Sequence, residues 1–247
     1  MDCVSSPVIL RGNCFDLLKE QPASHFDLLI TDPPYGTTNL PFDKVKLDWK
    51  LWWKEINRVC RPNAVQVVFA AQPFTTDLIS ANRTGFGYDL VWSKPNSVGF
   101  LNAKKLPLRS HESILIFKRR SCLHRGHAVY NPQMTEGTPY THRARRIPAH
   151  YSQRSVKDAA YRNEGTRYPT SILYYGRDQP SLHPTAKPIE LLRWLVRTYS
   201  HSGDRVLDCF MGAGSTGVAC VAESRQFVGM ELDEEYFEIA RGRLHPE

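Results

Sequence analysis

Residues 26–36 read Phe26-Asp27-Leu28-Leu29-Ile30-Thr31-Asp32-Pro33-Pro34-Tyr35-Gly36, an apolar run that passes directly into a proline-rich turn. Short apolar runs of this kind are typical of strands buried in a parallel sheet. Proline lacks an N–H and has a fixed φ, so two in a row predict a stiff turn whose carbonyl oxygens can accept hydrogen bonds. Because open α/β sheets bind ligands at the carboxyl ends of their strands, the stretch predicts a ligand site on such a sheet.

The groups of this turn suit a flat base that carries an exocyclic amino group. The Asp32 carboxylate and the Pro33 carbonyl can accept hydrogen bonds from the amino group, and the Tyr35 ring can stack on the base. A strand followed by an ordinary proline turn would have a similar sequence, so the assignment depends on a second motif.

The second motif lies near the other end of the chain. Arg205–Asp208 predicts a strand, Phe210-Met211-Gly212-Ala213-Gly214-Ser215-Thr216-Gly217 a glycine turn that opens a helix, and Gln226–Glu231 a strand whose terminal acid follows Asp208 by 23 positions. Such a turn lets a cofactor approach the backbone, and an acid at that offset suits ribose hydroxyls. A hydride-transfer enzyme would place a Gly-x-Gly-x-x-Gly turn near its start and would not need the proline turn. The two motifs together indicate a site for S-adenosylmethionine.

Four motifs in order carry a resemblance to a known family: Asp32-Pro33-Pro34-Tyr35, His183-Pro184-Thr185-Ala186-Lys187-Pro188, Asp208-Cys209-Phe210-Met211-Gly212-Ala213-Gly214-Ser215-Thr216 and Val228-Gly229-Met230-Glu231. The chain resembles the amino-methylating DNA methyltransferases of the β arrangement, in which the catalytic half precedes the cofactor-binding half. The resemblance covers about residues 8–118 and 181–244. Asn13 departs from it, because the family usually has Asp there against the cofactor's adenine. Ala213 and Ser215 also replace the commoner Ser and Thr of the glycine turn.

The resemblance implies a role for each site residue. The catalytic group is Asp32, Pro33, Pro34 and Tyr35, which would hold a base flipped out of duplex DNA for direct in-line methyl transfer. Asp208 would bind the methionine amino group, Glu231 the ribose hydroxyls, and Lys187 the cofactor carboxylate at a helix N-terminus. The full set predicted to bind the cofactor is Asn13, Thr185, Lys187, Asp208, Phe210, Gly212, Gly214, Ser215 and Glu231.

Alternating strand and helix patterns predict an α/β fold with a doubly wound, mostly parallel sheet of the S-adenosylmethionine-dependent methyltransferase type. Further strands are predicted at Val8–Arg11, Ala64–Ala70, Tyr88–Trp92 and Ser113–Lys118, the last two antiparallel at one edge. Helices are predicted at Cys14–Glu20, Leu51–Arg61, Pro73–Arg83, Pro188–Tyr199, Ser215–Glu223 and Glu234–Arg243. The expected division is a catalytic half at 1–118, a target-recognition insertion at 119–180 and a cofactor-binding half at 181–247.

The net positive charge of the chain is concentrated in the predicted insertion. Between Lys118 and Arg177 there are twelve Lys and Arg against three acids, whereas the whole chain has a net charge of +7. Basic residues interleaved with seven tyrosines are typical of a surface that binds phosphates and base edges, although a solvated basic loop would look similar. The predicted DNA-binding residues are Arg119, Arg120, Arg125, Arg143, Arg145, Arg146 and Arg154.

Composition limits the other possibilities. The six cysteines are scattered without a Cys-x-x-Cys pair, so neither a zinc site nor a disulfide framework is predicted. No apolar run reaches the roughly 20 residues of a membrane span. The N-terminus lacks the features of a secretory signal, so a reduced cytoplasm is expected. No Pro-Cys pair is present to supply the nucleophile for cytosine C5 methylation.

Several alternatives remain open at this point. Asp at the first position of the turn favours N6 of adenine, whereas cytosine N4 enzymes more often have Ser there. Enzymes acting on RNA or on a protein glutamine amide favour an Asn-Pro-Pro-Tyr turn. A non-catalytic nucleic-acid-binding protein would need only the basic segment. Double-stranded DNA is the expected partner, with a second copy of the chain and a cognate restriction endonuclease as further candidates.

Overall fold

The computed structural model describes residues 6–36, 47–118, 128–142, 161–176, 178 and 186–245. It divides into two compact units, one formed by 1–131 together with 171–247 and the other by 132–170. The predicted insertion at 119–180 therefore also includes a strand of the first unit, β10 (Ile172–Tyr174), which pairs with β4.

The first unit is built on one eight-stranded sheet with the order β1-β12-β11-β2-β3-β5-β4-β10. Its strands are β1 (Val8–Arg11), β2 (Phe26–Thr31), β3 (Cys60–Ala70), β4 (Phe86–Val98), β5 (Arg109–Lys118), β10, β11 (Arg205–Asp208) and β12 (Gln226–Glu231). All neighbouring pairs are parallel except those of β5, which is antiparallel to both β3 and β4. The doubly wound α/β prediction is thus confirmed, and so is the antiparallel pairing of β4 with β5. The pair does not form the edge of the sheet as predicted, because β10 lies outside β4.

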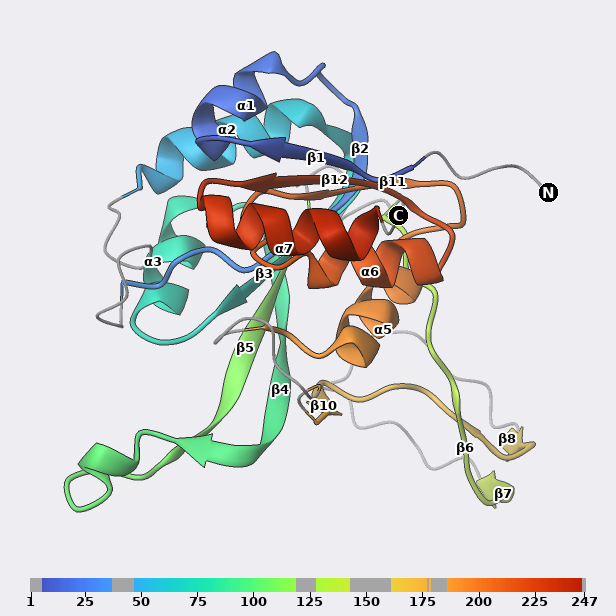
Figure 1. Cartoon of the computed structure of the whole chain (residues 1–247). Coiled ribbons are helices and arrows are strands. Elements are labelled where there is room, and N and C mark those ends of the chain that lie inside the picture. Colours follow the sequence, from blue (N-terminus) through green and yellow to red (C-terminus); the bar gives the residue numbers. More distant parts are fainter. Residues whose placement is uncertain are drawn as a thin grey trace. The chain divides into compact units, whose positions relative to one another are not determined.

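Among the described residues, six helices cover the two faces of this sheet (Figure 1). One face carries α1 (Cys14–Glu20), α2 (Trp49–Val59) and α3 (Phe74–Ala81), and the other carries α5 (Ile189–Tyr199), α6 (Ser215–Ala222) and α7 (Glu234–Leu244). Strand residues alternate between the two cores, as the pleat requires: Leu28 and Ile30 pack with α5, whereas Leu29 packs with α1 and α2.

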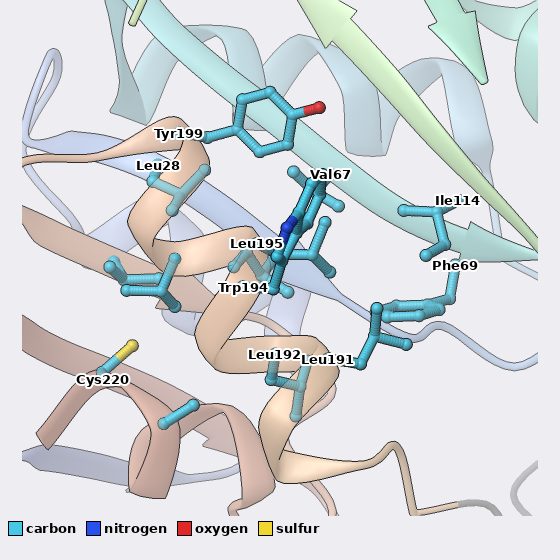
Figure 2. Close-up of a cluster of buried hydrophobic side chains, with 14 of the residues drawn as sticks. Leu28, Val67, Phe69, Ile114, Leu191, Leu192, Trp194, Leu195, Tyr199 and Cys220 are labelled. Atoms are coloured by element: carbon cyan, nitrogen blue, oxygen red, sulfur yellow. The ribbon is translucent and has the colours of Figure 1, made fainter. Parts of the chain in front are cut away.

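The α5 core shows how a helix is held on the sheet. Figure 2 shows Leu191, Leu195 and Tyr199 of α5 on the side of the helix that faces Leu28 and Val67 of the sheet. These side chains are buried, and full burial of each is worth roughly 1.5–3 kcal/mol. The packing fixes the start of α5 close to the sheet, where Lys187 enters the candidate site.

Strands β4 and β5 continue past β3 as a two-stranded hairpin (Figure 1). Its tip, residues 99–108, contains the short helix η2 (Phe100–Asn102). Phe100 and Leu101 of the tip are 81% and 96% exposed, although both are apolar. Leu106 and Leu108 of the tip are exposed as well, and a group of exposed apolar side chains is typical of an interaction site.

The second unit contains two small antiparallel pairs, β6 (Thr135–Glu136) with β9 (Thr166–Arg167) and β7 (Tyr140–His142) with β8 (Tyr161–Asn163). The turn between β8 and β9 is held by Asn163. Its Oδ1 accepts hydrogen bonds from the backbone N–H groups of Gly165 and Thr166 and from the Arg167 side chain.

Candidate active site

The two sequence motifs meet at the carboxyl ends of neighbouring strands. β2 and β11 are adjacent and parallel, so the turn after β2 and the turn after β11 lie at the same edge of the sheet. A hydrogen bond of 2.7 Å from the Thr31 hydroxyl to Oδ1 of Asp208 joins the two strand ends directly. This is the edge at which open α/β sheets bind ligands.

A cavity of about 240 Å³ opens at this edge. Its lining includes most of the residues that the sequence predicts: Asn13, Asp32, Pro33, Pro34, Tyr35, Lys187, Asp208, Phe210, Gly212, Ser215 and Glu231. Gly214 is not part of the lining and packs against Ala240 of α7. Thr185 and the seven predicted DNA-binding arginines lie outside the described residues.

The glycine turn after β11 is joined to the end of β12 through the Glu231 side chain, which accepts hydrogen bonds from backbone N–H groups. Gly212 and Gly214 have φ values of 51° and 77°, a region that residues with a Cβ rarely adopt, which explains the two glycines. The N–H of Gly212 donates to Oε2 of Glu231 over 2.8 Å, and the N–H of Asp233 donates to Oε1 over 2.8 Å. The Glu231 carboxylate is therefore fixed at the cavity wall.

Asp208 is a buried carboxylate with neutral partners. Its side chain accepts from the Thr31 hydroxyl and the Phe210 N–H, and the residue is only 3% exposed. Burial raises the pKa of Asp208 to about 6, although hydrogen bonds from Thr216 and Thr31 act against this. A buried charge without a cation is costly, so the site suits a ligand that brings its own positive group.

Glu231 and Asn13 complete this half of the cavity. Burial raises the pKa of Glu231, and the two backbone N–H groups only partly offset the effect. The Oδ1 of Asn13 accepts from the Phe15 N–H over 2.9 Å and so caps α1. The Glu231 carboxylate suits vicinal hydroxyls, and the Asn13 amide lies just beyond the end of the neighbouring strand. These polar groups match those that S-adenosylmethionine needs, so the residues present fit this cofactor.

The proline turn forms the other half of the cavity. Tyr35 stacks on Phe74 with ring centroids 5.4 Å apart, and its hydroxyl donates to Oδ1 of Asp32 over 2.5 Å. Oδ2 of Asp32 accepts a hydrogen bond from Lys187. Burial raises the pKa of Asp32, against the opposing effect of the Lys187 ammonium. The contact of Lys187 with the cofactor carboxylate stays a prediction, because in the structure Lys187 binds Asp32 of the proline turn.

Sequence reasoning missed Glu112, a cavity residue at the buried part of β5. It forms ion pairs with Lys94 of β4 and with Lys187. Burial opposes its ionisation, but the two ammonium groups hold the pKa of Glu112 below its usual value. The signal available in the sequence was an acid two residues before the apolar run 114–117, and it does not reveal the two lysines that Glu112 meets.

Two thiols also line the cavity, those of Cys14 and Cys209. Burial raises the pKa of Cys14 to about 12 and that of Cys209 well above the usual value. In the part of the chain that the structure describes, no group of three His, Cys, Asp or Glu side chains is placed to hold a metal ion. No helix of that part has the length and apolar character to cross a membrane.

Comparisons with known proteins agree with this geometry. The model of a DNA methylase family, the N6/N4 methylases, matches residues 26–242. The DNA adenine methyltransferase YhdJ of Escherichia coli (strain K12) is 28% identical over 96% of this chain and 82% of its own length.

Solved structures share the fold. A complex of M1.HpyAVI with SAM (S-adenosylmethionine) has a TM-score of 0.65 at 24% identity, covering 96% of this chain and 98% of that one. The PvuII DNA methyltransferase, described as cytosine-N4-specific, has a TM-score of 0.68 at 16% identity, covering 97% and 86%.

Proposed function

We propose that this chain, which belongs to the N6/N4 DNA methylase family, methylates N6 of adenine at specific sites in DNA. It is a DNA methyltransferase that uses S-adenosylmethionine. The observation that carries the proposal is the shared cavity: Asp32 of the proline turn and Asp208 and Glu231 of the glycine-turn half line one space. A cofactor held by the second group would thus lie beside a base held by the first.

Asp208 would hold the methionine ammonium and Glu231 the ribose hydroxyls, since Asp208 is buried and Glu231 half-buried at the cavity wall, and neither carries an ion pair among the described residues. When bound, the cofactor supplies an electrophilic methyl group on a sulfonium. Asp32 would accept a hydrogen bond from the target amino group and orient its nitrogen. Asp32 is also placed to take the proton that this nitrogen loses, because burial raises the pKa of its carboxyl.

Tyr35 would stack on the flipped base. One face of its ring lies on Phe74, so we expect the base on the opposite face, toward the cavity that Tyr35 lines. The hydroxyl of Tyr35 meanwhile keeps Asp32 in position through its hydrogen bond.

Adenine is favoured over cytosine by two observations. The turn begins with Asp32, where cytosine N4 enzymes more often have Ser, and YhdJ is described as an adenine methyltransferase. Cytosine N4 is the alternative, because the PvuII enzyme with the same fold is described as N4-specific.

DNA binding would involve two regions. The first is the basic segment with Arg119, Arg120, Arg125, Arg143, Arg145, Arg146 and Arg154. The second is the hairpin tip, 99–108, where exposed Phe100 and Leu101 lie near Lys104 and Lys105 in sequence, and where β5 leads back to Arg109 at the cavity. Apolar and cationic groups together suit insertion at a base step beside the phosphate backbone.

One experiment tests the proposal and separates the two bases. The protein is incubated with labelled S-adenosylmethionine and duplex DNA, and the digested nucleosides are identified by mass. We expect N6-methyldeoxyadenosine. N4-methyldeoxycytidine would select the alternative, and DNA that carries no label would refute both. The matched variants are Asp32→Asn, expected to lose turnover while cofactor affinity stays within a few-fold, and Asp89→Asn, an exposed acid of β4 that should behave like the parent.

Protein partners need a separate measurement. Sedimentation of the purified chain with and without DNA tests for a second copy, and co-purification from the native host tests for a cognate restriction endonuclease.

A further inference from the structure

Four charged side chains form a continuous buried row beside the cavity. Asp32 binds Lys187, Lys187 lies between Asp32 and Glu112, and Glu112 binds Lys94. The side chains of Lys94, Lys187 and Glu112 are 4%, 7% and 9% exposed, and that of Asp32 is 22% exposed. The row alternates in sign and has no net charge, which is how buried charges are usually tolerated.

Both carboxylate oxygens of Asp32 already accept a hydrogen bond in this structure. Its Oδ1 accepts from the Tyr35 hydroxyl, and its Oδ2 accepts from the Lys187 ammonium. With the Lys187 ammonium bound to it, the Asp32 carboxylate is a weaker acceptor for a hydrogen bond from any further group. It also opposes positive charge on a nearby nitrogen, and methyl transfer from a sulfonium moves positive charge onto the amino nitrogen.

Glu112 offers Lys187 a second acceptor. Oε1 of Glu112 is held by Lys94, whereas Oε2 accepts no hydrogen bond from any described residue, although Lys187 Nζ is 3.4 Å away. Buried carboxylate oxygens normally have a hydrogen-bond partner, so an unused one calls for an explanation. A small movement of Nζ toward Oε2 would supply that partner.

We infer that Lys187 moves from Asp32 to Glu112 when a target base enters, which makes Glu112 a positioning residue for methyl transfer; the inference rests on the proposed function. The transfer of Lys187 leaves Oδ2 of Asp32 to the amino group. The lone pair of the amino nitrogen forms the new N–C bond, the electron pair of the broken S–C bond stays on sulfur, and one proton leaves the nitrogen for Asp32. Glu112 touches neither substrate nor cofactor in this scheme and acts only by holding Lys187.

The chain contains a matched control. Glu223 is a carboxylate of similar exposure, 11%, and is likewise shared between two cations, Arg193 and Arg197. It does not line the cavity. Glu223→Gln therefore repeats the chemical change of Glu112→Gln at a site without a role in the reaction.

The kinetic test measures single-turnover methylation at saturating DNA and cofactor. Glu112→Gln keeps the shape of the side chain but replaces a charged acceptor by a neutral one, so we expect a roughly tenfold slower transfer with S-adenosylmethionine affinity within twofold of the parent. Glu223→Gln should transfer at the parent rate. A parent-like rate for Glu112→Gln, or a loss matched by equal losses of cofactor affinity or folded protein, would overturn the inference.

A structural measurement tests the movement itself. In a complex of the parent protein with S-adenosylhomocysteine and duplex DNA carrying the target site, we expect Lys187 Nζ closer to Glu112 Oε2 than to Asp32 Oδ2. An ammonium still bound to Asp32 beside the flipped base would overturn the inference, even if Glu112→Gln does not fold. A parent protein that labels no DNA would instead refute the proposed function, so the two failures are distinguishable.

Discussion

The Thr31 hydroxyl donates a 2.7 Å hydrogen bond to Oδ1 of Asp208 and so joins the last residues of β2 and β11. One strand leads into the proline turn and the other into the glycine turn. The bond therefore connects the two halves of the site, which lie far apart in sequence, through a single carboxylate. A change in the protonation of Asp208 should therefore affect both halves of the site.

The first prediction concerns the pH dependence of cofactor binding. Burial raises the pKa of Asp208 to about 6, and a bound ammonium group would lower it again. The carboxylate is thus present above pH 6 and protonated below it. We expect S-adenosylmethionine affinity to be greatest near pH 7, where the carboxylate and the cofactor's ammonium are both charged, and to fall by up to about tenfold per pH unit below pH 6, with proton release on binding. Calorimetry in buffers of different ionisation enthalpy measures both, and a flat profile in the parent contradicts the prediction.

Thr31→Val should move this profile. Valine keeps the size of the side chain but removes the hydroxyl that stabilises the Asp208 carboxylate, so the pKa of Asp208 rises further. Affinity should then fall at pH 6.5 and recover by pH 8. The matched control is Thr75→Val in α3, since Thr75 is also buried but its hydroxyl has no hydrogen-bond partner among the described residues. Equal profiles for the two variants would refute the link.

The hairpin tip predicts a salt-dependent contribution to DNA affinity. Replacing both Lys104 and Lys105 by Ala should lower the slope of log affinity against log salt by up to about two, because each phosphate contact contributes about one unit. Cofactor affinity should not change. Lys54→Ala, an exposed lysine of α2, serves as the control. An unchanged slope in the double variant would show that the tip does not contact phosphates.

The basic segment predicts a different effect, on site choice. Replacing Arg143, Arg145 and Arg146 one at a time and sequencing the methylated sites separates phosphate contacts, which weaken all sites alike, from base contacts, which relax one position. We expect at least one of these changes to broaden the recognised sequence. Unchanged site choice after exchange of the whole segment for a neutral linker, with activity retained, would place recognition elsewhere.

Most of the sheet could be predicted because its signals are local. The bounds of β1, α1, β11 and β12 agree with the patterns of apolar residues and caps in the sequence. β3 begins earlier than predicted, at Cys60 instead of Ala64, because Pro62 and Asn63 resemble a turn and yet continue the strand. Strand β10 has only three residues and forms by pairing with β4, so no local sequence pattern predicts it.

The candidate site was predictable where a motif carries it and not where distant contacts do. Asp208 and Glu231 are the last residues of their strands and Asp32 directly follows β2, so the sheet brings the three together at the edge where open α/β sheets bind ligands. Glu112 and Lys94 carry no such motif. Their burial depends on meeting Lys187 from a segment elsewhere in the chain, which only tertiary packing decides.

The protonation of the Cys14 and Cys209 thiols bears on whether the cofactor can methylate the protein itself. A sulfonium methyl donor is an alkylating agent, and a thiolate is a far better nucleophile than an amino nitrogen of a base. Cys14 and Cys209 line the same cavity, but burial keeps both protonated at neutral pH. We therefore expect these cysteines to escape methylation, so the intact mass of the protein should stay unchanged after prolonged incubation with the donor.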